Sequence, residues 1–261
     1  MTDDLFSVKG QIVLVSGASR GIGRAVAQGF ADREATVVIT GRVAETLQKT
    51  AGEICPPGGI VRAKVCDAAD AKALQRLADE VVAEFGRIDT LVNCAGVNKR
   101  MNVEQYDETT YDYITNINIR GAFFLATAVG RHMIRAGNGC QINIDSINSH
   151  RPLGRVAPYA MSKAAMSSMT RSLAMEWGPH GIRVNAVAPG FTLTDLARPL
   201  WKDAHLDKWR HENTPLRRMG YPEDMVGASI FLASKAASFI TGQVIYVDGG
   251  TTCGLFWPLG V

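Results

Sequence analysis

Short runs of β-branched and other apolar residues alternate along the chain with longer segments whose apolar positions recur at the period of a helix. The short runs predict buried strands at residues 11–16, 36–40, 60–66, 88–93, 141–145, 182–188 and 243–247. The longer segments predict helices at 21–31, 44–54, 70–85, 158–178 and 222–233, and a longer helical region that ends at Met133. Strict alternation of this kind predicts right-handed crossovers, and therefore an α/β fold with one doubly wound parallel sheet of about seven strands and helices on both faces.

Local signals agree with these boundaries and expose one irregular segment. Asp70 is a helix N-cap residue, and Gly86 and Gly178 stand where helices are expected to end. No linker, internal repeat or low-complexity segment divides the chain, so we expect a single domain over residues 1–261. Residues 191–221 interrupt the alternation between a strand and a helix, and an insertion of this length is typical of a substrate lid.

Composition excludes several classes of protein. Of 261 residues, 46% are hydrophobic and 20% are charged, as in an ordinary globular protein. The net charge of +3 is small and spread along the chain, so we expect neither a nucleic-acid partner nor a membrane surface. The acidic N-terminus does not resemble a signal peptide, and no apolar run approaches the roughly 20 residues that span a bilayer. Five cysteines without a Cys-x-x-Cys pair, and five histidines without ligand spacing, predict no disulfide, no metal and a cytoplasmic location.

A glycine-rich turn connects the first predicted strand to the first helix. Residues 16–23 have the sequence Ser-Gly-Ala-Ser-Arg-Gly-Ile-Gly, with glycine at Gly17, Gly21 and Gly23. Glycine permits backbone angles that a Cβ opposes, and it lets a pyrophosphate approach the positive end of a helix. A tight turn needs glycine even without a ligand, but at this place in a doubly wound sheet the spacing favours a dinucleotide site that includes Ser19, Arg20 and Ile22.

The choice of dinucleotide is expected at the end of the second strand. An acidic residue there binds the ribose 2′-hydroxyl of NAD, whereas an arginine accommodates the 2′-phosphate of NADP. This chain has Thr40-Gly41-Arg42, and Arg20 lies in the glycine turn. Two guanidinium groups suit a phosphate, so the sequence favours NADP, although both arginines are also compatible with a solvated surface and with NAD.

Tyr159 and Lys163 are four residues apart at the start of a predicted helix and therefore share one face. A phenol is a weak base at neutral pH, and a neighbouring ammonium favours its ionised form. Tyr-x-x-x-Lys is short enough to occur by chance. Here Ser146 follows the strand at 141–145, at the carboxyl edge of the sheet where α/β folds bind ligands.

The combined motifs resemble the short-chain dehydrogenase/reductase family over nearly the whole chain. They are the glycine turn, Asn93-Cys94-Ala95-Gly96 after the fourth strand, Ser146 with Tyr159 and Lys163, and Pro189-Gly190-Phe191-Thr192-Leu193-Thr194 after the sixth. The resemblance implies a Rossmann-like fold and an NAD(P)-dependent oxidoreductase that interconverts a secondary alcohol and a ketone.

The resemblance also implies a role for each matching residue. Tyr159 would exchange a proton with the substrate oxygen, Lys163 would bind the nicotinamide ribose, and Ser146 would orient the substrate. Asn118, rather than its neighbour Asn116, would anchor a water that relays protons. The remaining cofactor contacts would come from Asp67 near the adenine, Asn93 near the adenosine ribose, and Ala95, Gly96, Pro189, Gly190, Thr192 and Thr194.

Two positions depart from the common pattern of the family. Cys94 replaces an asparagine, and with no identifiable histidine neighbour we interpret it as a small buried side chain rather than a reactive thiol. Asp145 places a carboxyl group beside the catalytic serine, where a small or hydroxyl residue is more usual. The sequence leaves the role of Asp145 open.

The residues expected around the substrate are polar, which disfavours a steroid or a long acyl chain. They are Asn98 and Arg100 on one side and Asn148 and His150 on the other, with Trp201 from the lid. The chain is similar in this respect to gluconate 5-dehydrogenase-like members, so we expect a sugar, polyol or sugar acid. The alternatives are a 3-oxoacyl or other ketone reductase, and a catalytically silent cofactor-binding scaffold. The resemblance further implies a homotetramer, and the apolar tail at 251–261 is expected to pack against a neighbouring subunit.

Overall fold

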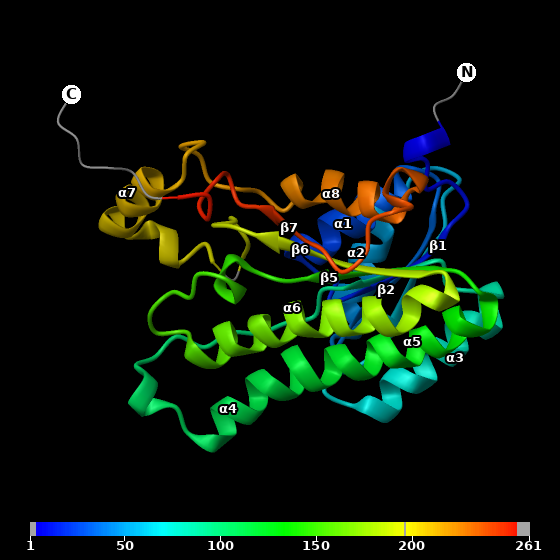
Figure 1. Ribbon diagram of the computed structural model, residues 1–261, viewed down its shortest axis with the longest axis horizontal. Coiled ribbons are helices and arrows are strands. Elements are labelled where there is room, and N and C mark those ends of the chain that lie inside the picture. Colours follow the sequence, from blue (N-terminus) through cyan, green and yellow to red (C-terminus); the bar gives the residue numbers. More distant parts are fainter. Residues whose placement is uncertain (1–3, 196, 255–261) are drawn as a thin grey trace.

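The computed structural model describes residues 4–195 and 197–254. In this part of the chain, a parallel sheet of seven strands has the order β3-β2-β1-β4-β5-β6-β7 (Figure 1). The strands are β1 (Ile12–Ser16), β2 (Thr36–Gly41), β3 (Val61–Val65), β4 (Thr90–Asn93), β5 (Gly139–Ile144), β6 (Ile182–Pro189) and β7 (Val244–Val247). Each strand begins and ends within two residues of its predicted position, so the doubly wound sheet is confirmed.

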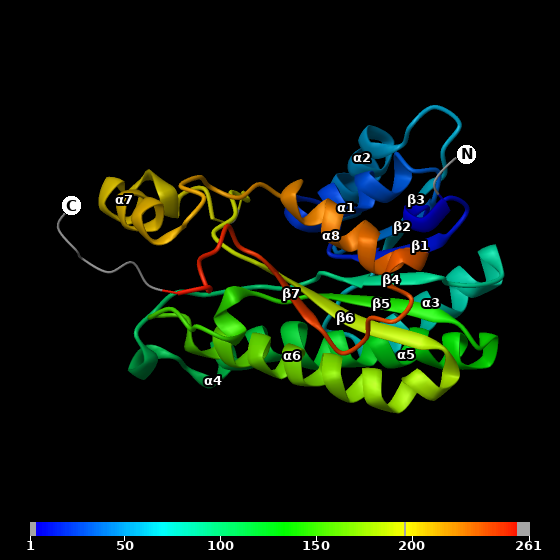
Figure 2. The same ribbon diagram turned by 45° about the horizontal axis from the view of Figure 1, so that its top comes forward.

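Helices cover both faces of this sheet (Figure 2). One layer contains α1 (Gly21–Ala31), α2 (Ala44–Ile54) and α8 (Asp224–Ala233). The other contains α3 (Ala71–Phe85), α4 (Glu108–Thr115), α5 (Ala122–Ala136) and α6 (Ala157–Trp177). The predicted caps are present, because the Asp70 carboxylate accepts from the backbone N–H groups of Lys72 and Ala73, and Gly86 ends α3 with φ of 83°.

Alternation along β1 explains how one strand contributes to two hydrophobic cores. Val13 and Val15 pack with α1, α2 and α8, whereas Ile12 and Leu14 pack with α3, α5 and α6. Successive side chains of a strand point to opposite faces, so a central strand covered on both sides buries its side chains in both cores. The apolar run at residues 12–15 of β1 therefore fits its place in the middle of the sheet.

The long helical region that the sequence predicts before Met133 is divided into three parts. A π-helical turn, Asn116–Gly121, joins α4 to α5. The turn passes the loop after β3 so closely that a Cβ on Gly121 would lie 1.9 Å from the carbonyl oxygen of Ala68. A side chain at this position would displace the backbone, so the close packing of the two segments requires glycine at position 121.

The order of the strands creates a crevice at one edge of the sheet. β1 pairs with β2 on one side and with β4 on the other. The connection after β1 therefore runs toward one side of the sheet, and the connection after β4 runs toward the other side. In open α/β sheets, ligands bind at this switch point, beyond the carboxyl ends of the strands.

The predicted lid, residues 191–221, contains a 3-10 turn (Leu200–Lys202) and the helix α7 (Ala204–Asn213). Its two ends are joined by backbone hydrogen bonds, from Gly220 to Phe191 at 2.9 Å and from Leu193 to Gly220 at 2.8 Å. Arg218 adds a bidentate pair with Asp224 at 2.7 Å. The insertion therefore projects from a narrow base, as Figure 1 shows for α7.

Candidate active site

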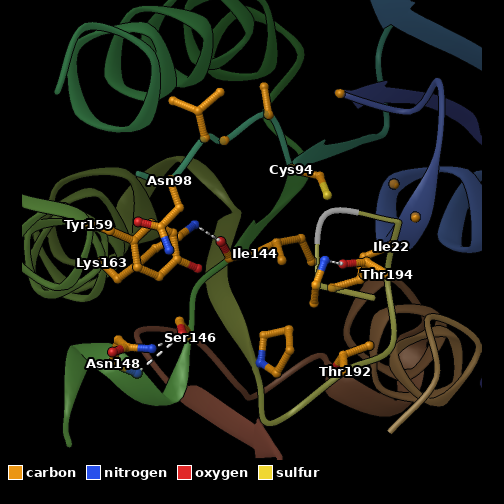
Figure 3. Close-up of a pocket in the computed structure, with 18 of the residues that line it drawn as sticks. Ile22, Cys94, Asn98, Ile144, Ser146, Asn148, Tyr159, Lys163, Thr192 and Thr194 are labelled. Carbon is orange, nitrogen blue, oxygen red and sulfur yellow. Dashed lines mark hydrogen bonds between the residues drawn. The ribbon is translucent and has the colours of Figure 1, made fainter. Parts of the chain in front are cut away.

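A cavity of about 820 Å³ opens where the turns after β1, β4, β5 and β6 meet the lid. In Figure 3, Tyr159, Lys163 and Ser146 lie on one side of it, and Ile22, Thr192 and Thr194 lie on the other. The predicted residues that line the cavity are Gly17, Ser19, Arg20, Gly21, Ile22, Gly23, Arg42, Asp67, Ala95, Gly96, Asn98, Arg100, Ser146, Asn148, Tyr159, Lys163, Pro189, Gly190, Thr192, Thr194 and Trp201.

The glycine turn has the shape that a dinucleotide requires. Gly17 has φ of 65°, and a Cβ on it would lie 2.7 Å from the Cα of Ala95. Arg20 occupies the N-cap position of α1, and its side chain does not cap the first backbone N–H groups of the helix. Uncapped N–H groups at a helix N-terminus bind a pyrophosphate, so the turn fits the predicted cofactor.

Ser16 joins the two turns that flank the crevice. Its Oγ accepts from the backbone N–H groups of Cys94, at 3.0 Å, and Ala95, at 3.1 Å. Asn93, predicted near the adenosine ribose, lies behind these turns rather than on the cavity wall. It is 2% exposed and donates from Nδ2 to the carbonyl oxygen of Ala122 at 2.8 Å. Asn93 therefore links β4 to α5.

Exposed polar residues surround the part of the cavity nearest to β2 and β3. Arg20 and Arg42 are exposed, and their guanidinium groups have no hydrogen-bond or ion-pair partner in the described chain. Asp67 is also exposed, and its Oδ1 accepts from the backbone N–H of Ala69 at 3.0 Å. The arrangement leaves two cations available for an anionic group at this end of the cavity.

Tyr159 and Lys163 reach the cavity from the first two turns of α6. The ammonium of Lys163 lies 5.8 Å from the centroid of the Tyr159 ring and donates to the carbonyl oxygen of Ile144 at 2.6 Å. Lys163 is only 4% exposed. The end of β5 therefore fixes the cation beside the phenol.

Ser146 follows β5 on the same wall as Tyr159. Its Oγ accepts from the backbone N–H of Asn148 at 3.1 Å and from the Asn148 Nδ2 at 3.2 Å (Figure 3). These two bonds use the acceptor capacity of the hydroxyl, so its hydrogen remains for a substrate oxygen. Asn148 also accepts from the N–H of Leu153 at 2.9 Å, so its side chain holds Ser146 and the loop instead of facing a substrate freely.

Asn118 lies behind the cavity wall in the π-helical turn. It is fully buried, accepts from the N–H of Val97 at 2.8 Å, and donates to the Val97 carbonyl at 2.9 Å and to Ser162 Oγ at 3.0 Å. Its amide joins the turn after β4 to α6. Both hydrogens of its amide nitrogen are therefore used within the protein.

The remaining predicted substrate residues have different surroundings. Asn98 lines the cavity, and its buried Oδ1 has no hydrogen-bond partner in the described chain. His150 lies outside the lining and packs on Tyr246 with ring centroids 6.0 Å apart. Trp201 lines the cavity and packs edge-on against Phe191 at 5.5 Å.

Several lining residues were not predicted. Arg155 is exposed at the cavity with a φ of 66°, and no sequence signal marks that backbone conformation for an arginine. Phe191 stands inside the Pro-Gly-Phe-Thr motif and contacts both Trp201 and Trp209, so its place next to two motif residues was a usable signal. Leucine side chains from the lid and the loop before α6 complete this apolar side of the cavity: Leu153, Leu200 and Leu206.

Cys94 lines the cavity. Burial raises the pKa of the Cys94 thiol to about 11, so it stays protonated at neutral pH. Among residues 4–195 and 197–254, no three His, Cys, Asp or Glu side chains gather closely enough to hold a metal ion. None of the helices in the same part of the chain is long and apolar enough to cross a membrane.

Comparison with known proteins decides the family. A family model described as enoyl-(acyl carrier protein) reductase matches residues 17–252. Gluconate 5-dehydrogenase of Gluconobacter oxydans is 38% identical over 252 residues, which cover 97% of this chain and 98% of that protein. The chain belongs to the short-chain dehydrogenase/reductase family. It is thus an NAD(P)-dependent oxidoreductase that acts on CH–OH groups, and the alternative of a catalytically silent scaffold is wrong.

Other members of the short-chain dehydrogenase/reductase family show the same full-length similarity. D-threitol dehydrogenase of Mycolicibacterium smegmatis is 37% identical, with 95% of each chain covered. The crystal structure of a gluconate 5-dehydrogenase from Burkholderia cenocepacia J2315, in complex with NADP and tartrate, superposes with a TM-score of 0.93. It is 36% identical and covers 97% of this chain and 99% of its own. The predicted family, fold and reaction class are confirmed.

Proposed function

We propose that this enzyme is an NADP-dependent dehydrogenase that interconverts a secondary alcohol and a ketone on a sugar, a polyol or a sugar acid. The observation that carries the proposal is the set of polar side chains, Asn98, Arg100 and Arg155, in the wall of the cavity that also holds Tyr159. A few polar groups in a cavity wall orient a substrate by hydrogen bonds, and a polyhydroxy compound offers several hydroxyls to them.

Each catalytic side chain has a defined task in this proposal. When bound, the nicotinamide ring supplies or accepts the hydride at the substrate carbon. In reduction, the O–H bond of Tyr159 breaks and its proton passes to the substrate oxygen, and in oxidation the phenolate takes that proton back. Ser146 donates a hydrogen bond to the same oxygen, and Lys163 holds the ribose and stabilises the phenolate. Asn118 keeps the turn after β4 in place beside α6.

NADP rather than NAD is proposed because of the two free guanidinium groups. Arg20 and Arg42 border the cavity at the end of β2, and Thr40 and Gly41 offer no carboxylate to the ribose. Asp67 and the turns at 95–96 and 189–194 would hold the rest of the dinucleotide. The similar gluconate 5-dehydrogenase from Burkholderia cenocepacia is in complex with NADP, which supports this choice.

The charge at the cavity mouth favours a substrate with a carboxylate. Arg100 and Arg155 both line the cavity, and their loops are joined, because the carbonyl of Arg155 accepts from the N–H of Met101 at 3.1 Å. Tyr106 reinforces the junction by donating to the carbonyl of Lys99 at 2.6 Å. Relatives named gluconate 5-dehydrogenase support a sugar acid, and the relative named D-threitol dehydrogenase supports a neutral polyol.

A 3-oxoacyl or other ketone reductase is the second candidate. The lid side of the cavity is apolar, with Phe191 between Trp201 and Trp209, and such a wall would also cover an acyl chain. The description of the matching family model as a reductase of carrier-protein substrates supports the same alternative. The polar residues opposite the lid favour the first candidate.

We also propose a homotetramer in a reducing cytoplasm. Apolar side chains are exposed on the outer face of α4, α5 and α6, at Tyr111, Tyr113, Phe123, Phe124, Met161 and Met175. A patch of this kind on a globular protein is typical of a subunit interface. Among the small residues of α6, Ala164 and Ser168 are exposed, whereas Ala160 and Ser167 face the interior. The five cysteines are all free thiols, which fits a reducing compartment. The tail residues 255–261 lie outside the described residues.

A substrate panel tests the proposal. Aldonates and neutral polyols are each assayed with NADP or NAD, and 3-oxoacyl thioesters are assayed with the reduced form of each cofactor. Every reaction is followed by the absorbance of the reduced nicotinamide. We expect turnover of polyhydroxy compounds, a higher kcat/KM with NADP, and a strongly reduced rate in Tyr159→Phe. Turnover confined to acyl thioesters would transfer the assignment to the second candidate.

A further inference from the structure

Asp145 is a buried carboxyl group that has no role in the chemistry proposed above. It follows β5 directly, precedes Ser146, and is 2% exposed. Its backbone N–H donates to the carbonyl of Val187 at 2.8 Å, which continues the pairing of β5 with β6. A buried carboxylate needs several donors or a cation, because an uncompensated buried charge is costly.

Helix α6 approaches this residue with two side chains one turn apart. Ser167 donates from Oγ to Oδ2 of Asp145 in a short hydrogen bond. Lys163, four residues earlier on the same face, donates to the carbonyl oxygen of Ile144 at 2.6 Å. The ammonium is therefore held on the peptide that leads into Asp145, and the carboxyl group lies against the next turn of the same helix.

The second carboxylate oxygen accepts no hydrogen bond from the described residues. Oδ1 of Asp145 is buried and has no hydrogen-bond partner within the described residues. Burial raises the pKa of Asp145, whereas the Lys163 ammonium and the hydroxyls of Ser167 and Ser149 lower it. An interaction between two charges is mutual, so the charge of Asp145 acts on the Lys163 site as well.

Few other charged groups lie near Asp145 and Lys163. On the turn after β5, His150 and Arg151 are exposed, and Arg151 donates to a backbone carbonyl at 3.1 Å. The turn after β4 presents Cys94, whose pKa burial raises to about 11, so it carries no charge. β6 contributes the apolar Val187. Tyr159 is the other titratable group on α6 that faces the cavity.

We propose that Asp145 is a positioning residue for proton transfer: its carboxylate, bound to Ser167 and adjacent to the Ile144 carbonyl that holds the Lys163 ammonium, opposes loss of the proton from Tyr159. The proposal rests on the proposed roles of Tyr159 and Lys163. Part of the positive charge that would stabilise a phenolate is offset by the carboxylate. Tyr159 consequently keeps its proton to a higher pH than it would beside an unopposed ammonium, and proton donation to a ketone is favoured at neutral pH.

Asp145→Asn tests this with almost no change of shape. The amide removes the negative charge, so the phenolate forms at lower pH and the rise of kcat/KM for alcohol oxidation moves by about 0.5 to 1 pH unit toward acid. Asp145→Ser is made in parallel as a second neutral side chain. An unmoved or alkaline-shifted profile in the folded variants would overturn the proposal.

A second readout needs no substrate. The near-ultraviolet absorbance of tyrosinate is titrated with NADP bound, and the same titration of a Tyr159→Phe counterpart is subtracted, so that only Tyr159 contributes. Asp145→Asn should shift this midpoint in the same direction as the rate profile. A shift in absorbance without activity on polyhydroxy compounds would overturn the proposed substrate and leave the role of Asp145 in place. Activity on polyhydroxy compounds without a shift of the absorbance midpoint would overturn the role of Asp145 and leave the proposed substrate in place.

Ser167→Ala is the matched control. It removes the hydrogen bond to Oδ2 but leaves the charge of Asp145, so the midpoints should remain within about 0.2 pH unit of those of the unmodified enzyme, because a neutral hydroxyl acts on its neighbours less than a full charge. Thermal unfolding and the Kd for NADP are measured for all variants. Equal shifts in Ser167→Ala and Asp145→Asn would mean that the carboxyl group only packs the helix against the strand.

Discussion

The ammonium of Lys163 lies 5.8 Å from the centroid of the Tyr159 ring, one turn further along α6. A helix fixes the spacing of the two side chains, and the bond from Lys163 to the end of β5 fixes the ammonium. Neither contact involves the lid. The phenol and the cation are therefore arranged before any ligand binds, which is the condition for efficient electrostatic catalysis.

Tyr159→Phe should lower kcat by about 10²- to 10⁴-fold, the range that a positioned proton donor contributes. The ring still packs at the start of α6, so the Kd for NADP should remain within about twofold, since only a hydroxyl is lost. Steady-state rates and fluorescence titration with NADP measure the two effects. Retention of full turnover would show that another group moves the proton.

Arg42→Ala should raise the KM for NADP by about tenfold or more, because a charge-assisted bond to a phosphate is lost, and should change the KM for NAD little. Arg24→Ala is the control. Arg24 pairs with Glu53 at 3.1 Å on the outside of α1 and does not line the cavity. An equal loss for both cofactors in Arg42→Ala would mean that this arginine does not read the phosphate.

Gly17→Ala should destabilise the protein by about 1–3 kcal/mol and abolish cofactor binding, because it adds a side chain at positive φ. The new Cβ would lie 2.7 Å from the Cα of Ala95. Gly52→Ala provides the opposite case, because Gly52 lies inside α2 with nothing within 4 Å of an added Cβ. It should stabilise the protein by about 0.5–1 kcal/mol. Denaturant unfolding compares the two variants.

Asp145 also predicts a dependence of stability on pH. Burial raises its pKa in the folded protein, so the folded state binds its proton more tightly than the unfolded chain does. Its contribution is fully present below the ordinary pKa of 3.8 and is lost as the pH rises through the folded-state value. The stability of Asp145→Asn relative to the unmodified enzyme should therefore increase over that interval. Thermal unfolding at a series of pH values measures the difference, and a difference that is constant with pH would contradict it.

Asp224→Asn should loosen the base of the lid. Arg218 holds the pKa of Asp224 below its ordinary value of 3.8, mainly through a direct hydrogen bond. The stabilisation is present above that value and disappears as the pH falls through the lower folded-state pKa. Because the pair is partly exposed, we expect no more than about 1 kcal/mol at neutral pH. Limited proteolysis should cut faster between residues 191 and 221, and an unchanged cleavage rate would show that backbone bonds alone hold the lid.

Local sequence preferences determined the elements of this fold. Apolar runs such as β1 are buried on both faces, and the caps Asp70 and Gly86 act within one turn, so their effects are visible without the fold. The same holds for Tyr159 and Lys163, because the geometry of a helix alone brings residues four apart together. The family resemblance then placed Ser146 on the same wall.

Packing between distant segments decided the rest. Asn93 and His150 were expected at the cavity but lie away from it, because Asn93 bonds to the start of α5 and His150 packs on β7. Arg155 reaches the cavity through a positive φ that no local preference of arginine indicates. Asp145 binds Ser167, and its Oδ1 has no hydrogen-bond partner among the described residues. Both features arise because α6 packs against the end of β5 in the tertiary structure. The sequence determined which elements form and which side chains share a helix face. The direction and burial of a side chain depend on contacts between residues that are far apart in the chain, and only the tertiary structure provides those contacts.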